Sequence, residues 1–211
     1  MNTNDLIARL SAVPAAPRLR PAMLALAIAA AIVGPALVFY SVLGMRPDLS
    51  LAWRNPVVPF KTILPLLTCG LSLTLLLRLS RPEARPGLIP LGYILPIAAA
   101  LALWVGAFML RAPADRFAEV GMASLGECLG GVLALSVVPT LVTLRVLRQG
   151  ASTYPGLSAF LSGLTAASGA AAGYSLFCTR DNPLFFVTWY GFSILIVTGL
   201  AAWFGKRMLS W

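Results

Sequence analysis

The chain has 211 residues, of which 59% are hydrophobic and only 11% are charged, and its formal net charge is +9. A soluble domain carries about 25% charged residues, so this composition excludes an ordinary water-soluble fold and predicts that lipid covers much of the surface. The absence of histidine excludes imidazole metal ligands and a histidine general base.

Six apolar stretches follow one another along the chain. A helix needs about 20 apolar residues to cross a bilayer, and inside lipid the backbone polar groups must be satisfied within the helix itself. We therefore predict an all-α fold, an integral membrane bundle of six transmembrane helices over residues 21–211, preceded by a segment of residues 1–20. The predicted spans are residues 21–43, 57–77, 87–110, 121–144, 155–178 and 183–205.

The second span is the weakest of the six. Its uninterrupted apolar run covers residues 62–77, and it reaches further back only if Lys61 extends its ammonium group to the membrane surface. The predicted span over residues 57–77 depends on that conformation of Lys61.

Basic residues set the expected orientation. With six spans, the N-terminus, the second and fourth loops and the C-terminus share one side, which holds ten of the 16 basic residues and two of the seven acidic ones. Short loops rich in Lys and Arg stay in the cytoplasm, so both termini are predicted to be cytoplasmic. The basic excess is then explained by the membrane surface, and direct binding of nucleic acid is not expected.

Two cysteines are predicted to lie at one depth near the outer surface. Cys128 stands near the start of the fourth span and Cys178 at the end of the fifth, which runs in the opposite direction. Three interpretations stay open: apolar packing, a structural disulfide, or a pair that responds to oxidants or to a soft metal ion. Glu127, Asp181 and Met122 are candidate additional ligands.

Glycines spaced four residues apart occur in both of these spans. Gly126 and Gly130 lie in the fourth span, and Gly169 and Gly173 in the fifth. Small residues at this spacing let membrane helices approach closely, so these four glycines are predicted to serve helix packing.

The segment before the first span contains a short amphipathic pattern. Leu6, Ile7 and Leu10 fall on one apolar face, preceded by Asp5. Such a helix either lies on the lipid headgroups or binds in a groove of a cytoplasmic partner. The residues alone leave both interpretations open.

No catalytic constellation is visible, so an enzyme is not predicted. Proton-coupled carriers need ionisable groups inside the membrane, and only Glu127 and Lys61 qualify, both near span ends. A small-molecule permease or an accessory membrane subunit stays as the alternative to a regulator.

Short segments spread over the whole chain carry a resemblance to a known family. They are Asn4-Asp5-Leu6-Ile7, Arg46-Pro47-Asp48-Leu49, Cys128-Leu129, Pro139, Gly150-Ala151 with Pro155, Gly163, Tyr174 followed by Cys178, Phe186 with Trp189-Tyr190, and the ending from Gly205 to Trp211. In these residues the chain resembles the NrsF-type membrane anti-sigma factors of proteobacteria. Cys69 has no counterpart in the pattern.

The resemblance implies a multi-pass protein of the bacterial inner membrane that sequesters an extracytoplasmic-function sigma factor and is not an enzyme. It implies that Cys128 and Cys178 sense heavy metals or oxidants, and that no cofactor is required beyond a candidate soft metal ion at this pair. Asp5, Leu6, Ile7 and Leu10 become candidate sigma-docking residues. Our hypothesis is that oxidation or metal capture draws the fourth and fifth helices together, with a hinge at Pro139, and lowers the affinity of the cytoplasmic face for the sigma factor.

Overall fold

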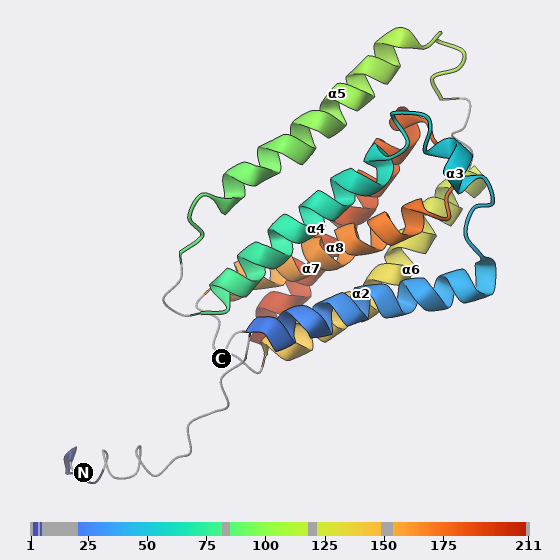
Figure 1. Cartoon of the computed structure of the whole chain (residues 1–211). Coiled ribbons are helices and arrows are strands. Elements are labelled where there is room, and N and C mark those ends of the chain that lie inside the picture. The colour runs from blue at the N-terminus through green and yellow to red at the C-terminus, as the bar shows by residue number, and fades with distance from the viewer. Residues whose placement is uncertain are drawn as a thin grey trace.

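A computed structural model describes residues 2, 3, 5, 21–81, 85–117, 122–148 and 154–209, and every regular element in these residues is a helix (Figure 1). The prediction of an all-α fold is confirmed. The elements are α2 (Pro21–Leu43), α3 (Leu49–Ala52), α4 (Phe60–Leu79), the 3-10 helix η1 (Ile89–Tyr93), α5 (Ile94–Leu110), α6 (Met122–Leu147), α7 (Pro155–Ser175) and α8 (Pro183–Leu209).

Five helical stretches in the described residues, not six, are long and apolar enough to cross a membrane. They are Pro21–Leu43, Phe60–Leu79, Ile89–Leu110, Gly126–Leu147 and Pro183–Leu209. The predicted span over residues 155–178 is the exception. It forms α7, which is long enough with 21 residues but consists largely of Ala, Gly, Ser and Thr. Such residues contribute little apolar surface, and the position of α7 explains why little is needed.

Helix α7 lies in the interior of the bundle. It contacts α8, α4, α6 and α2, and from Leu161 to Ala172 every residue except Leu164 is buried. A Cβ atom added at Gly163 would lie 2.5 Å from the Cβ of Ala201 on α8. Small side chains on α7 therefore let four neighbouring helices approach it closely.

Helix α5 has the opposite environment. Figure 1 shows it at the edge of the bundle, and Pro96 is its only buried residue. Its contacts with the longer helices are to α8 and α4, and the indole Nε1 of Trp104 donates a hydrogen bond of 3.0 Å to Oγ1 of Thr188 on α8.

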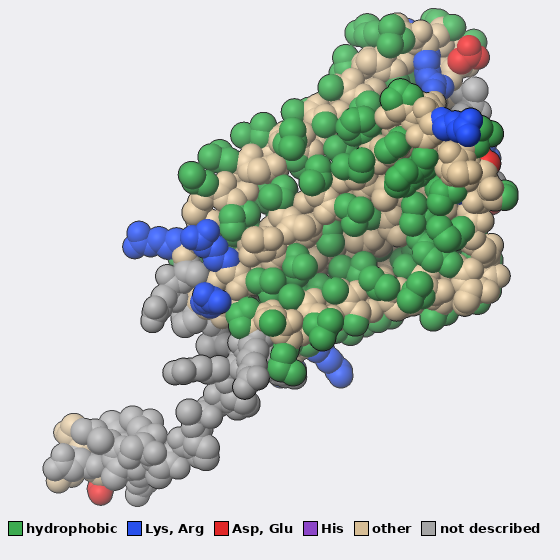
Figure 2. All heavy atoms as spheres, viewed as in Figure 1, with side chains coloured by type: hydrophobic (Ala, Val, Ile, Leu, Met, Phe, Trp, Pro, Cys, Tyr) green, Lys and Arg blue, Asp and Glu red, His purple; other side chains and the backbone are tan. Residues whose placement is uncertain are grey.

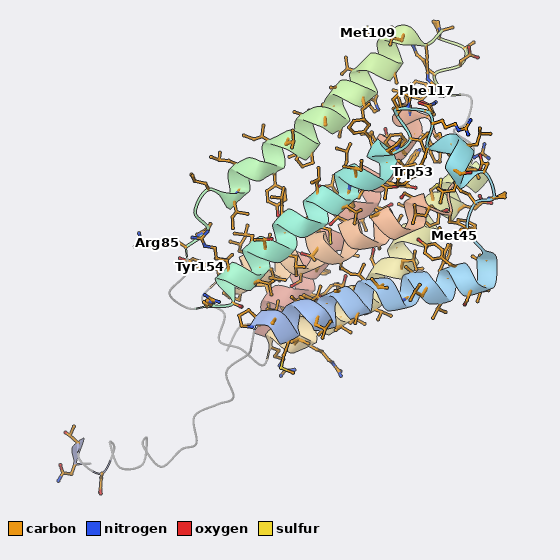
Figure 3. All side chains as sticks on the ribbon, in the orientation of Figure 1. Met45, Trp53, Arg85, Met109, Phe117 and Tyr154 are labelled. Carbon is orange, nitrogen blue, oxygen red and sulfur yellow. The ribbon has the colours of Figure 1, made fainter. Side chains whose placement is uncertain are left out.

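The surface divides into an apolar flank and two charged ends. Figure 2 shows apolar side chains over the visible flank and charged side chains toward the ends. In Figure 3, Trp53 lies at one end and Tyr154 at the other, and both are exposed. Trp and Tyr are enriched at membrane interfaces, so these two residues fit the two headgroup levels of a bilayer.

Candidate functional site: a buried pair of thiols

The structure brings two cysteines from distant parts of the sequence into contact. The Sγ atoms of Cys128 and Cys178 are 3.5 Å apart, both thiols are free, and the residues are 2% and 4% exposed. Cys128 lies in the second turn of α6, and Cys178 follows the last residue of α7, Ser175. A disulfide has a sulfur–sulfur distance of about 2.05 Å, so the two sulfurs touch without being bonded.

Lys61 is buried directly against the segment that carries Cys178. It lies in the first turn of α4 and is 1% exposed. Its Nζ donates hydrogen bonds of 2.7 Å to the carbonyl oxygens of Cys178 and Arg180, and one of 3.3 Å to Oδ1 of Asp181. Lys61 does not take the extended conformation on which the start of the predicted second span depended, because these protein oxygens replace water around its ammonium group.

Arg46 holds the same segment from the side of α2. Its guanidinium donates to both carboxylate oxygens of Asp181, at 2.8 and 2.9 Å, and to the carbonyl oxygen of Cys178 at 3.3 Å. It also donates to both oxygens of Asp48, at 2.8 and 2.9 Å. These bonds hold the pKa of Asp48 below its usual value and raise the pKa of Arg46. Paired bonds of this kind are strong and directional, so Arg46, Lys61, Asp48 and Asp181 form a clamp that fixes Cys178.

A cavity of about 280 Å³ adjoins the thiols. Cys128 and Cys178 line it, together with Glu127, Arg46 and Arg180. Glu127 and Arg180 are exposed, so the cavity extends from the surface of the molecule to the two sulfurs. A small reagent from outside has a route to a pair that is otherwise buried.

Comparison with known proteins identifies the relatives of this chain. The family profile described as "Negative regulator of sigma F", NrsF, matches residues 8–211. The chain belongs to the NrsF family. It is 32% identical over 216 residues to the probable anti-sigma-F factor NrsF of Azospira oryzae, and 31% identical over 222 residues to the anti-sigma-F factor NrsF of Caulobacter vibrioides. Both alignments cover the full length of both chains. No solved structure matches.

The candidate metal ligands are not assembled around the thiols of this NrsF-family chain. Glu127 lines the cavity, but the carboxylate of Asp181 is already bound by Arg46 and Lys61. The side chain of Met122 lies outside the described residues. Within those residues, no group of three His, Cys, Asp or Glu side chains is arranged to hold a metal ion, so the soft-metal expectation gains no support.

The predicted packing glycines differ from one another in their surroundings. A Cβ at Gly169 would lie 2.9 Å from Ile32 on α2, and one at Gly173 would lie 3.4 Å from Ala36. At Gly126 and Gly130 no atom lies within 4 Å of such a Cβ, so these two do not mark a close helix contact.

The glycine of α6 that does pack closely is Gly131. A Cβ there would lie 2.3 Å from the ring of Tyr174 on α7. Gly131 follows Cys128 by three residues, and positions three apart share one face of a helix. Gly131 lies outside the predicted glycine pairs. Its three-residue spacing from Cys128 could have identified it as the packing position.

The candidate docking segment lies mostly outside the described part of the chain. Leu6, Ile7 and Leu10 are among the residues that the structure does not describe, whereas Asp5 is described and exposed. The docking role of these residues stays a prediction.

Sequence reasoning missed the clamp. The sequence pattern predicts no partner for Arg46, Asp48 or Lys61, although Lys61 stands out as one of two ionisable groups near the span ends. The available signal was their rarity: with 11% charged residues, any charge that borders an apolar span is expected to have a partner.

Proposed function

We propose that this protein holds a sigma factor at the bacterial inner membrane and releases it when Cys128 and Cys178 are oxidised to a disulfide. Membership of the NrsF family supports the first part, since both curated relatives are named as anti-sigma-F factors. The partner expected from the sequence is a sigma factor of the extracytoplasmic-function class. The observation that carries the second part is the 3.5 Å separation of two buried sulfurs beside a surface cavity.

In the proposed topology, α7 is a sixth spanning helix, which lies in the interior of the bundle. Basic residues stand in the last turns of α4, α6 and α8: Arg78, Arg145, Lys206 and Arg207. The start of α2 and the end of α8 lie at this same end of the bundle (Figure 1). By the positive-inside rule this end is cytoplasmic, which puts the thiols on the outer side.

Disulfide formation requires only a small movement of the two sulfurs. To form a disulfide the sulfurs must approach by about 1.5 Å, while two electrons and two protons pass to an oxidant such as a peroxide. Helices α6 and α7 already pack side by side, so the movement falls on the segment of Cys178 rather than on whole helices.

The clamp supplies a route from the thiols to the other side. Arg46 follows the end of α2 and Lys61 lies in the first turn of α4, so a shift of Cys178 acts on both helices. The start of α2 follows residues 1–20, in which we place the docking residues Asp5, Leu6, Ile7 and Leu10. A tenfold loss of affinity for the sigma factor corresponds to about 1.4 kcal/mol. A disulfide typically stabilises a fold by about 2–4 kcal/mol, which is more than this.

The cysteine pair is tested in a reporter strain that depends on the cognate sigma factor. We expect the double substitution Cys128→Ser with Cys178→Ser to keep repression but to abolish induction by hydrogen peroxide, because no disulfide can form. Cys69→Ser is the matched control, since Cys69 lies within α4 and its loss should leave induction intact. Induction that persists in the double variant would remove the thiol switch.

The docking residues are tested by deleting residues 2–12 and purifying the protein from membranes. We expect the sigma factor to co-purify with the full chain but not with the deletion variant, because the apolar face of Leu6, Ile7 and Leu10 is gone. Equal amounts of both proteins in the membrane are the control. Unchanged co-purification would transfer docking to the loops between α4 and α5 or between α6 and α7.

The permease alternative gains nothing from the cavities between helices. One of about 410 Å³ lies between α6 and α8, and its lining includes Leu133, Val137 and Leu200. Another of about 150 Å³ lies among α4, α5 and α8 and is lined mainly by apolar side chains. Linings of this kind suit lipid chains or packing better than a polar solute.

A further inference from the structure

The two thiols of the pair have unequal surroundings. The carbonyl oxygen of Cys178 accepts hydrogen bonds from Lys61 at 2.7 Å and from Arg46 at 3.3 Å, so two buried cations stand beside this one residue. The Asp181 carboxylate, 3.3 Å from Lys61, is already bound by Arg46 at 2.8 and 2.9 Å. Cys128 lies in α6, and its sulfur contacts that of Cys178 at 3.5 Å. A negative charge is therefore better stabilised on the sulfur of Cys178 than on that of Cys128.

Hydrogen-bond donors strengthen this difference. The Cys128 thiol, followed by the Lys61 ammonium and the backbone N–H of Arg180, lowers the pKa of Cys178, which lies beyond the end of α7. The buried hydroxyl of Tyr190 reaches no partner at hydrogen-bond distance, but it is close enough to Cys178 to favour the thiolate. The two sulfurs lie 3.5 Å apart, so a thiolate on Cys178 can accept a hydrogen bond from the thiol of Cys128.

We infer that Cys178 is the attacking thiolate of the pair, that Cys128 is the resolving thiol, and that Lys61 is the positioning residue that imposes this order. The inference rests on the proposed function in one respect, namely that the pair is oxidised in use. It adds an order of events and a role for the most buried charged side chain at the site.

The proposed oxidation has two steps. The Cys178 thiolate attacks one oxygen of a peroxide, so that an S–O bond forms, the O–O bond breaks, and the leaving oxygen takes a proton from solvent to become water or an alcohol. The Cys128 sulfur then attacks the sulfenic acid on Cys178. An S–S bond forms, the S–O bond breaks, and the hydroxide leaves as water with the proton of Cys128. The peroxide gains two electrons and each sulfur loses one.

The pH dependence of this order of attack is set by the titration of Cys178 among the charged groups around the thiol pair. Titratable and charged groups surround the thiol pair from α6, α7, α8, α4 and the segment after α2: Cys128 and Glu127, Tyr174, Tyr190, Lys61, Arg46 and Asp48, and Arg180 and Asp181 from the segment of Cys178. Because these neighbours together lower the pKa of Cys178, its thiolate persists to lower pH than that of an ordinary cysteine and is lost as the pH falls through the lowered pKa.

The order is tested on the purified full chain carrying Cys69→Ser, in lipid nanodiscs and without any sigma factor. Short pulses of iodoacetamide at pH 5 to 9 are followed by peptide mass spectrometry of both sites. At pH 7 we expect Cys178 to be alkylated at least about tenfold faster than Cys128, since one pKa unit is a tenfold change in thiolate fraction. Alkylation of Cys128 at an equal or higher rate would overturn the inference. This experiment leaves all the clamp residues unsubstituted, so it does not depend on whether a clamp variant folds.

The role of Lys61 is tested with Lys61→Met in the same protein. Loss of the buried ammonium should reduce the preference for Cys178 by about tenfold and move its pH profile to higher pH, partly offset by the greater nucleophilicity of a more basic thiolate. Arg54→Gln is the matched control, because Arg54 is exposed and lies before α4 on the same side. An unchanged preference in Lys61→Met protein with native helicity would remove Lys61 from the mechanism. If that variant does not fold, Lys61→Arg, which keeps the charge, must keep the preference.

A sulfenic acid trap checks the two roles with hydrogen peroxide itself. With dimedone present, Cys128→Ser protein should collect the adduct at Cys178, whereas Cys178→Ser protein should collect none at Cys128. The opposite pattern would reverse the order. Because no sigma factor is present, these results stand or fall separately from the reporter experiment.

Discussion

Helices α7 and α5 differ in almost every respect that decides where a membrane helix lies. Helix α7 contacts four neighbouring helices and is buried along most of its length. Helix α5 stands at the edge and buries only Pro96. Yet the stretch containing α5 is among the five apolar enough to cross a membrane, and α7 is not. In this bundle the most buried helix is the less apolar one.

The most buried helix can be the less apolar one because the solvent around the bundle is lipid rather than water. Lipid tails are as apolar as leucine, so a leucine gains little by moving from lipid into the protein. Close contact between helices is gained instead where side chains are small, as on α7. Serine hydroxyl groups are tolerated there where they bond within the helix: Ser162 donates to the carbonyl oxygen of Ser158 at 2.7 Å, and Ser175 to that of Ala172 at 2.6 Å. A tightly held α7 then presents Cys178 in a fixed place.

The largest effect is expected when a bulky side chain is placed on α7, where neighbouring helices approach closely. Gly163→Leu on α7 should prevent assembly of the bundle, because even a Cβ would lie 2.9 Å from the Cα of Thr198 and 3.0 Å from the carbonyl oxygen of Val197, which are backbone atoms of α8. Gly106→Leu on α5 is the matched change, since nothing lies within 4 Å of a Cβ there. Monodispersity in detergent and thermal unfolding by circular dichroism measure both variants.

Equal damage from both substitutions would contradict the comparison. It would mean that the edge position of α5 is filled in the membrane, for example by a second copy of the chain. An unaffected Gly163→Leu protein would mean that α7 and α8 can separate without loss of the fold.

Particular residues show how far the sequence could predict this structure. The helical class, and the placement of Cys128 and Cys178 at the same end of successive helices, follow from apolar length and from the alternating direction of successive spans, which are local properties of the chain. The sequence predicted an apolar span over residues 155–178, but α7 is not among the stretches apolar enough to cross a membrane, because it packs against other helices through small side chains. Lys61 was misplaced because its partners, the carbonyl oxygens of Cys178 and Arg180, are far away in sequence and carry no side-chain signal.

The smallest expected effect tests how α5 is held. Trp104→Phe removes the 3.0 Å hydrogen bond to Thr188 and should lower the stability of the bundle by about 0.6 kcal/mol, the average for side-chain hydrogen bonds between membrane helices. Thr188→Val should have the same effect, and the double variant should add nothing further, because both changes remove one bond. A thermal unfolding series in nanodiscs measures all three. Additive losses would mean that Trp104 and Thr188 stabilise the bundle by separate contacts. Helix α5 would then be held mainly by its packing against α4 and α8, as α7 is held by its own neighbours.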